Sequence, residues 1–310
     1  MAASALRGLV LAGLLLGAAA AHADAFRVCD EGRPLTVRQQ DRELRFAAAV
    51  RDRLQASAAP VAVIARAGLD LERFGQRYSH AGLALREPAS EGSAPWAVRQ
   101  LYFDCEAGRP RLFDQGLAAF VRGADRPDSG FIAALLLPPD AAQTLERAAR
   151  DLPTSRSVLH PRYSANAHAW SLLYQNCNQW VIELIARALD AGAASAASDD
   201  THMHRQQAQA WLRDAGYEPA VFQLSPWMLP AAAFVPWLRQ DDHPAADLEA
   251  LQLRITMPAS IEAFLMGRWP ATQRLEFCQG PTGIVVREGP QALDRTCEPT
   301  HPGDTFIPWD

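Results

Sequence analysis

Apolar residues recur along the chain at two spacings, and each spacing predicts one kind of element. Between residues 37 and 55 they recur every three or four positions, which is typical of an amphipathic helix. Shorter runs rich in β-branched and aromatic residues predict strands, and 78–86 is expected to pair with 96–103 in an antiparallel manner. The remaining expected elements are strands at 61–64 and 131–137, helices at 141–151 (with Asp140 as N-cap), 177–189, 203–215 and 260–266, and a hairpin of 275–277 against 283–287. Helices before and after a small antiparallel sheet predict an α+β fold.

The first 23 residues have the pattern of a secretory signal peptide. Arg7 provides a positive n-region, the stretch 9–21 is small and apolar, and Ala21 and Ala23 form an A-x-A cleavage pattern. The apolar run is too short for a membrane span, and no later segment approaches the length of one. The sequence therefore predicts an extracytoplasmic protein, periplasmic or secreted, without a membrane span.

Cleavage after residue 23 leaves 287 of the 310 residues, which is long for one domain but not clearly two. We expect a core at 24–190 and, packed on it, an extension at 191–310 that contains further helices and the C-terminal hairpin. The net charge of -5 and the lack of a basic cluster argue against nucleic-acid binding. All thirty basic residues are Arg, so Schiff-base catalysis by lysine and a P-loop lysine are both excluded, and no cofactor is expected.

The chain has five cysteines, an odd number for a compartment that favours disulfides. Cys278 and Cys297 flank a short segment rich in Gly and Pro and are expected to staple the C-terminal hairpin. Cys29 and Cys105 are a second candidate pair. Cys177 is then the unpaired thiol, which is either a reactive group or a small buried hydrophobic residue.

Two short segments carry candidate chemistry. His80 begins an apolar strand and is followed by Ala81 and Gly82, while Cys177 is the first residue of the expected helix 177–189. The free N–H groups and the dipole at a helix start lower the pKa of a thiol and can also stabilise an oxyanion. A histidine on a neighbouring strand would take the thiol proton and later protonate the leaving group.

These segments resemble the circularly permuted branch of the papain-like superfamily, which includes NlpC-type cell-wall hydrolases and the lecithin–retinol acyltransferase group. In that branch the catalytic histidine precedes the cysteine, on a strand with the pattern H-x-G-[IVL], and residues 80–83 match it as His-Ala-Gly-Leu. The acyltransferase pattern N-C-x-x-[FW]-V is similar to residues 176–181, and the resemblance covers about 61–189. It implies a permuted papain-like core whose sheet packs on the cysteine-bearing helix. The whole chain also resembles a bacterial family known only as domain of unknown function 2145.

The resemblance further implies a third, polar catalytic residue on the strand after the histidine strand, often His, Glu or Asp. The strand 96–103 offers Arg99 and Gln100, and only Gln100 has an acceptor atom that could fix the imidazole tautomer. Asn176, Asn178 and Ser79 are the candidate substrate-binding residues, and Asn176 can equally be the N-cap of the helix.

Two other features invite a functional interpretation. His202 and His204 are two positions apart and point to different sides of a helix, and no further ligand cluster completes a site, so no metal is expected. The tryptophans and prolines of 226–237 either line a groove for lipid or peptide or pack within the protein.

Together these patterns favour an exported cysteine hydrolase or acyltransferase that acts on an amide, peptide or ester bond. Cys177 would be the nucleophile, His80 the general base and acid, and Gln100 the residue that orients His80. Compartment and family analogy favour cell-wall peptide as substrate, with lipid acyl groups second. The alternative is an inactive exported binding or assembly protein on the same scaffold.

Overall fold

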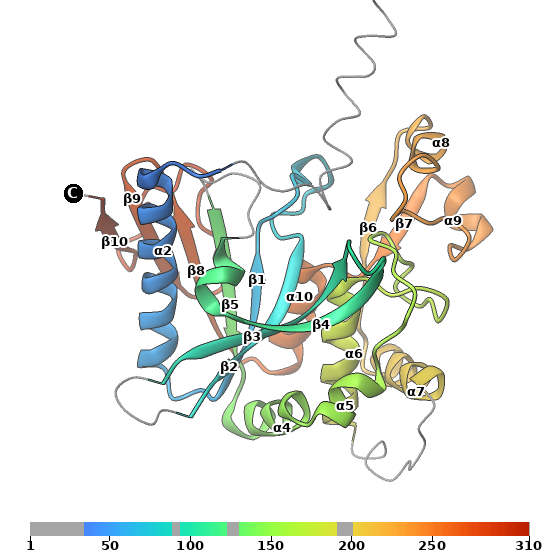
Figure 1. The fold of residues 1–310 in the computed structure, drawn as a ribbon, viewed down its shortest axis with the longest axis horizontal. Helices are drawn as coiled ribbons and strands as arrows, with labels where there is room; N and C mark the ends of the chain where they lie inside the picture. The colour runs from blue at the N-terminus through green and yellow to red at the C-terminus, as the bar shows by residue number, and fades with distance from the viewer. Residues whose placement is uncertain (1–33, 89–93, 123–129, 191–200, 310) are drawn as a thin grey trace, which may run out of the picture.

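The computed structural model describes residues 34–88, 94–122, 130–190 and 201–309, and these form an α+β protein around one large antiparallel sheet (Figure 1). Eight strands lie in the order β10-β9-β8-β5-β1-β2-β3-β4, and β6 pairs with β7 separately. The strands are β1 (Val61–Arg66), β2 (His80–Arg86), β3 (Trp96–Asp104), β4 (Arg109–Gly116), β5 (Gly130–Leu136), β6 (Ala220–Gln223), β7 (Gln252–Ile255), β8 (Gln273–Gln279), β9 (Gly283–Glu288) and β10 (Thr305–Pro308). The sheet is larger than the small one expected, because three C-terminal strands continue it beyond β5.

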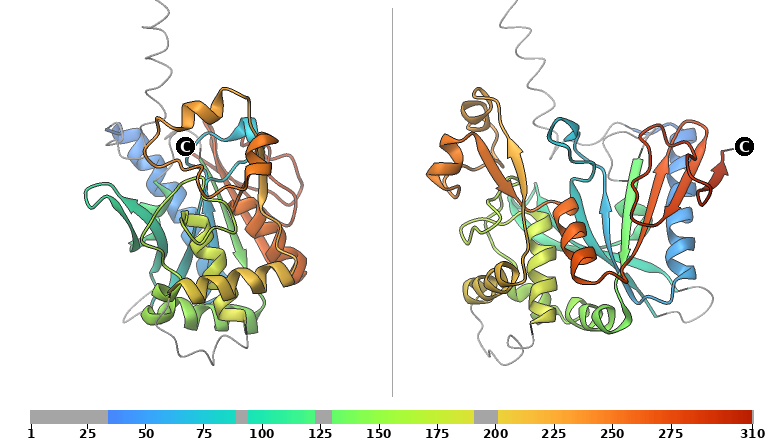
Figure 2. Two further views of the ribbon diagram at one scale, coloured as in Figure 1. Left: turned by 90° about the vertical axis from the view of Figure 1, so that its right-hand side faces the viewer. Right: turned by 180° about the vertical axis from the view of Figure 1, so that it is seen from behind.

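Helices cover both faces of this sheet (Figure 2). In the described part of the chain the α-helices are α2 (Val37–Ala56), α3 (Leu117–Val121), α4 (Pro139–Arg150), α5 (Leu152–Ser157), α6 (Cys177–Leu189), α7 (Thr201–Asp214), α8 (Met228–Ala232), α9 (Ala245–Glu249) and α10 (Pro258–Arg268), with one 3-10 helix, η2 (Glu72–Phe74). The hydrophobic cluster on one face holds residues of α2 and α3. The cluster on the other face holds residues of α4, α6, α7 and α10. We call these the α2 face and the α6 face.

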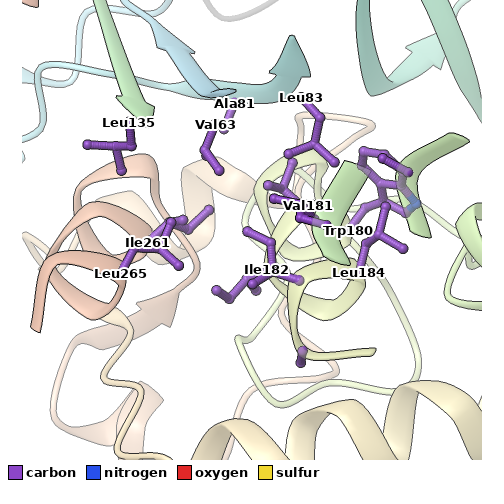
Figure 3. Packing of buried hydrophobic residues seen from close by; sticks show 14 of the residues in the cluster. Val63, Ala81, Leu83, Leu135, Trp180, Val181, Ile182, Leu184, Ile261 and Leu265 are labelled. Carbon is purple, nitrogen blue, oxygen red and sulfur yellow. The ribbon is translucent and has the colours of Figure 1, made fainter. Parts of the chain in front are cut away.

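Side chains of β2 alternate between the two faces of the sheet and therefore contact different layers of helices. Ala81 and Leu83 belong to the cluster on the α6 face, where Leu83 points toward Val181 of α6 (Figure 3). Ala84 belongs to the cluster on the α2 face. Because successive side chains of a strand alternate between faces, His80 lies on the α2 face together with Ala84.

Helix α6 is anchored at its start and at its middle. At the start, Asn176 and Gln179 form a capping box, in which the side chain of each accepts a backbone N–H of the other. At the middle, the Glu183 carboxylate accepts a hydrogen bond from Arg205 of α7 at 2.8 Å, and both side chains are fully buried. The Gln209 amide also donates to Glu183 at 2.8 Å. These bonds compensate the buried carboxylate and hold the middle of α6 against α7.

Most expected elements are present, with differences at their ends. Residues 78–86 and 96–103 pair antiparallel as expected, and so do 275–277 and 283–287. The expectation that Asp140 caps a helix was wrong. Helix α4 begins at Pro139, with Pro138 as N-cap and Asp140 in the first turn, because the fixed φ of proline suits the first helical position.

The expectations for the disulfides, the N-terminus and membrane spans compare with the structure as follows. Cys278 and Cys297 form the expected disulfide, with Cα atoms 5.4 Å apart. Cys105 is also disulfide-bonded, while Cys29 and the expected signal peptide lie outside the described residues. Among the helices that are described, none has the length and hydropathy needed to span a membrane.

Candidate functional site

His80 and Gln100 are in direct contact across the start of β2 and the middle of β3. The Nε2 atom of His80 lies 2.5 Å from Oε1 of Gln100, and both side chains are buried. An amide oxygen can only accept, so the imidazole donates from Nε2. The other ring nitrogen, Nδ1, then carries the lone pair and is the atom able to take a proton.

Gly82 makes room for this contact. A Cβ atom at position 82 would lie 2.8 Å from Cγ1 of Val98 and 3.3 Å from Cβ of Gln100. A side chain at position 82 would therefore crowd Val98, the backbone of Arg99 and the start of the Gln100 side chain. The glycine two residues after His80 is thus explained by close packing of β2 against β3.

The surroundings of His80 keep its imidazole neutral. Its ring lies against Tyr102 and Phe120, with ring centroids 5.8 and 6.0 Å away. Burial lowers the pKa of His80 to about 3, and the positive charge of Arg66 acts in the same direction. Arg66 is directly opposite His80 in the β1–β2 register. At neutral pH His80 is consequently an uncharged base.

Cys177 is the first residue of α6 and the free cysteine of the described chain. Its side chain is 8% exposed. The backbone N–H of Asn178 and the side chain of Tyr163 hydrogen-bond the sulfur and lower its pKa, as does the charge of Arg66. Burial outweighs them and raises the pKa of Cys177 to about 11. The expectation of a lowered pKa at this helix start is therefore wrong, because desolvation exceeds the effect of the N–H groups.

Residues next to His80 and Cys177 in the sequence are in contact, although His80 and Cys177 are not hydrogen-bonded to each other. Cys177 belongs to the hydrophobic cluster on the α6 face, whereas His80 lies on the α2 face. No hydrogen bond joins His80 to Cys177. The Nδ2 atom of Asn178 donates to the carbonyl of Ser79 at 3.1 Å, so residues adjacent to each candidate are in contact. Both candidates thus lie at the same end of the sheet.

Strands β2 and β3 are not paired with each other at this end of the sheet. The β2–β3 ladder runs from Arg86 opposite Trp96 to Leu83 opposite Arg99 and ends there. The first three residues of β2 pair only with β1. The β2–β3 ladder therefore ends three residues after His80, and the start of β2 contacts β3 there through side chains such as that of Gln100.

The three expected substrate-binding residues have different structural roles. Asn176 is the N-cap of α6, and its Oδ1 accepts the N–H of Gln179 at 2.7 Å. The hydroxyl of Ser79 accepts the N–H of Leu69 at 3.0 Å. Asn178 is different, because its Oδ1 atom is buried without a hydrogen-bond partner. Of the three, Asn178 has an acceptor left for a bound molecule.

Two residues near the site carried no signal in the sequence. Tyr163 lies in an irregular segment and meets Cys177 only because it forms a bridge with Gln175, close to the start of α6. Arg66 ends a buried strand, where its charge acts on both His80 and Cys177. Their positions depend on contacts distant in sequence.

Other residues considered from the sequence have roles elsewhere. Arg99 binds both carboxylate oxygens of Asp114, at 2.7 and 2.5 Å, and also the carbonyl of Ala149, away from the imidazole. Among the residues that the structure places, no group of three or more His, Cys, Asp or Glu residues is arranged to hold a metal ion, and this includes His202 and His204.

Comparison with known proteins identifies the family of this chain. No match was found among curated proteins or among solved structures. A family model described as "Uncharacterized protein conserved in bacteria (DUF2145)" matches residues 53–265, which is more than half of the chain. The chain therefore belongs to the bacterial family DUF2145.

Proposed function

We propose that this protein is an exported thiol hydrolase or acyltransferase that cleaves an amide, peptide or ester bond. Cys177 is the nucleophile, His80 the base, and Gln100 the residue that orients His80. The observation that carries the proposal is the His80–Gln100 hydrogen bond of 2.5 Å, which leaves Nδ1 of a neutral imidazole as proton acceptor. A carboxamide that fixes the tautomer of a catalytic histidine serves the same purpose as the acid of a hydrolase triad.

The pKa values define the resting state of the proposed pair. With the pKa of Cys177 raised to about 11 and that of His80 lowered to about 3, both groups are uncharged at neutral pH. The thiol must therefore lose its proton during attack and not before it. This is general-base catalysis, and it differs from a preformed thiolate–imidazolium pair.

The proposed reaction proceeds in two steps. Nδ1 of His80 takes the Sγ proton as the sulfur attacks the substrate carbonyl, and a tetrahedral oxyanion forms. The oxyanion donor in this proposal is the N–H of Asn178 at the start of α6, which bonds the thiol sulfur in the resting state and would turn to the oxyanion as it forms. The imidazolium then protonates the departing amine or alcohol, leaving an acyl thioester on Cys177. Water, or an acceptor alcohol or amine, attacks this thioester with His80 again taking the proton, and the thiol is restored.

In the proposed reaction the thiol approaches the imidazole at the start of β2, where the β2–β3 ladder has ended. Ser79 and Asn178 already touch there, so closing the remaining separation requires a movement of side chains and of the first turn of α6. Catalytic hydrogen bonds that are long in a free enzyme often tighten only when substrate binds. The favoured substrate is cell-wall peptide, and lipid acyl groups are second, on compartment and family analogy.

A second function is an exported binding or assembly protein without catalysis. The observation that favours it is the placement of Cys177 and His80 on opposite faces of the sheet, with the thiol 8% exposed. In that case the His80–Gln100 bond and the buried thiol only stabilise the fold.

Labelling with substrate-like electrophiles separates the two functions. The folded protein is incubated at pH 7.5 with a peptidyl and a fatty-acyl electrophile, and adducts are mapped by peptide mass spectrometry. The enzyme proposal expects an adduct on Cys177 with at least one of them. His80→Ala should abolish this adduct, while His301→Ala, at an exposed histidine, should leave it unchanged.

Two results would reject the enzyme. One is a folded protein in which neither electrophile modifies Cys177. The other is an adduct that forms equally fast in the His80→Ala variant, since the imidazole would then have no part in the attack. Circular dichroism of each variant confirms that the fold is retained before labelling is compared.

A further inference from the structure

The segment 219–238 contains no charged side chain, although 21% of the residues in the chain are charged. It runs from β6 through α8 and projects beyond the eight-stranded sheet (Figures 1 and 2). Trp227, the N-cap of α8, is 63% exposed, and Phe234, just after the helix, is 76% exposed. Val221 of β6 is 48% exposed. We call Val221, Trp227 and Phe234 the apolar tip.

Residues next to the apolar tip pack against a small hydrophobic cluster. Met228 and Leu229 of α8 pack against a separate small cluster that contains Phe222 and Leu253. The exposed aromatic side chains are therefore held outward by a folded unit. Exposed aromatic side chains in a segment without charged residues suit burial at a lipid interface.

The backbone of this segment is bonded within itself. Four prolines, at 219, 226, 230 and 236, have no N–H to satisfy. Amides that bond carbonyls of the same segment are those of Met228, Ala231, Phe234, Val235 and Leu238. Burial in lipid is costly for unpaired backbone groups, and this segment has paired many of them internally.

We propose that the apolar tip binds the surface of a neutral lipid bilayer, with Trp227 and Phe234 at the boundary between head groups and acyl chains. Tryptophan and other aromatic side chains favour that boundary. The charge around the tip gives no attraction for an anionic surface. Residues 218–254 contain five acidic residues and two arginines, and Arg254, opposite Val221 in the β6–β7 ladder, pairs with Asp247, so the net charge is negative and does not favour anionic head groups.

Flotation with phosphatidylcholine vesicles tests the proposal on the folded protein. The double variant Trp227→Ser, Phe234→Ser should bind about tenfold more weakly than the natural protein, because two apolar side chains are lost from the interface. The matched control is Leu44→Ser, Leu152→Ser, which removes two leucines that are 58% and 45% exposed on α2 and α5. This control should bind as the natural protein does. The single variant Phe234→Glu should also weaken binding.

Several outcomes would overturn the proposal. They are absence of vesicle binding, binding that the tip variants do not weaken, and binding that becomes stronger when phosphatidylglycerol is added. Self-association in sedimentation without lipid, removed by the same tip variants, would instead identify a second copy of this chain as the occupant. Thermal melting of each variant shows that the fold is intact.

Discussion

Gln100 holds the imidazole of His80 through a buried hydrogen bond of 2.5 Å between Oε1 and Nε2. Replacing Gln100 by Leu removes the acceptor and leaves a buried N–H unpaired, which should lower the free energy of unfolding by about 1–3 kcal/mol. Nitrogen-15 NMR of the histidine ring should then show loss of the single tautomer protonated at Nε2. Gln143→Leu, at an exposed glutamine of α4, is the control and should change neither quantity. A tautomer that stays the same in Gln100→Leu would contradict the assigned contact.

Substitution of Gly82 tests the crowding between β2 and β3. Gly82→Ala places a methyl group 2.8 Å from Cγ1 of Val98, so we expect a loss of about 1–3 kcal/mol in urea denaturation. Gly267→Ala is the matched control, since a Cβ at position 267 meets nothing within 4 Å. Because Gly267 lies within helix α10, this control should be neutral or slightly stabilising. Equal effects of the two substitutions would refute the packing explanation for the glycine after His80.

The lowered pKa of His80 predicts a pH dependence of stability. In the folded protein the pKa is about 3, below the ordinary value of 6.5, so the unfolded chain binds a proton more readily. This contribution to stability is complete above pH 6.5 and is lost as pH falls toward 3, with a slope of up to about 1.4 kcal/mol per pH unit. Denaturation at several pH values, compared with His80→Gln, isolates the contribution. A difference between the two proteins that does not vary between pH 6.5 and 4 would exclude it.

The raised pKa of Cys177 predicts a slow reaction with small alkylating agents. At pH 7.5 iodoacetamide should modify Cys177 more slowly in the folded protein than in urea, because burial keeps the thiol protonated and covered. The rate in the folded protein should continue to rise above pH 9. Mass spectrometry of the peptide that contains Cys177 measures both rates. A rate that levels off below pH 8 would instead indicate a preformed thiolate.

The buried ion pair Glu183–Arg205 predicts a large effect on stability. Glu183→Gln keeps the shape of the side chain but leaves the charge of Arg205 uncompensated, which should cost about 3–5 kcal/mol. Asp52→Asn breaks the exposed pair with Arg51 and should change stability by less than about 0.5 kcal/mol. Urea denaturation of both variants provides the comparison. Similar costs for the two would show that the buried pair does not anchor α6.

Several features of the site could be predicted from the sequence because they depend on local chemistry. The capping box at Asn176 and Gln179 places Cys177 at a helix start through contacts within one turn. Gln100 was predicted as the partner of His80 because the resemblance implies a polar residue on the strand after the histidine strand, and Gln100 has the acceptor atom there that Arg99 lacks. The pairing of Cys278 with Cys297 follows from their nearness in sequence.

Other features were decided by the tertiary structure alone. Alternation along β2 puts His80 and Ala81 on opposite faces, but only the packing of α6 shows that Cys177 joins the face of Ala81. The pKa of Cys177 is set by how many atoms surround it, and this overrides the helix start visible in the sequence. Desolvation and layer placement are properties of the whole fold, so residues such as Tyr163 and Arg66 could be placed beside the thiol only by the folded chain.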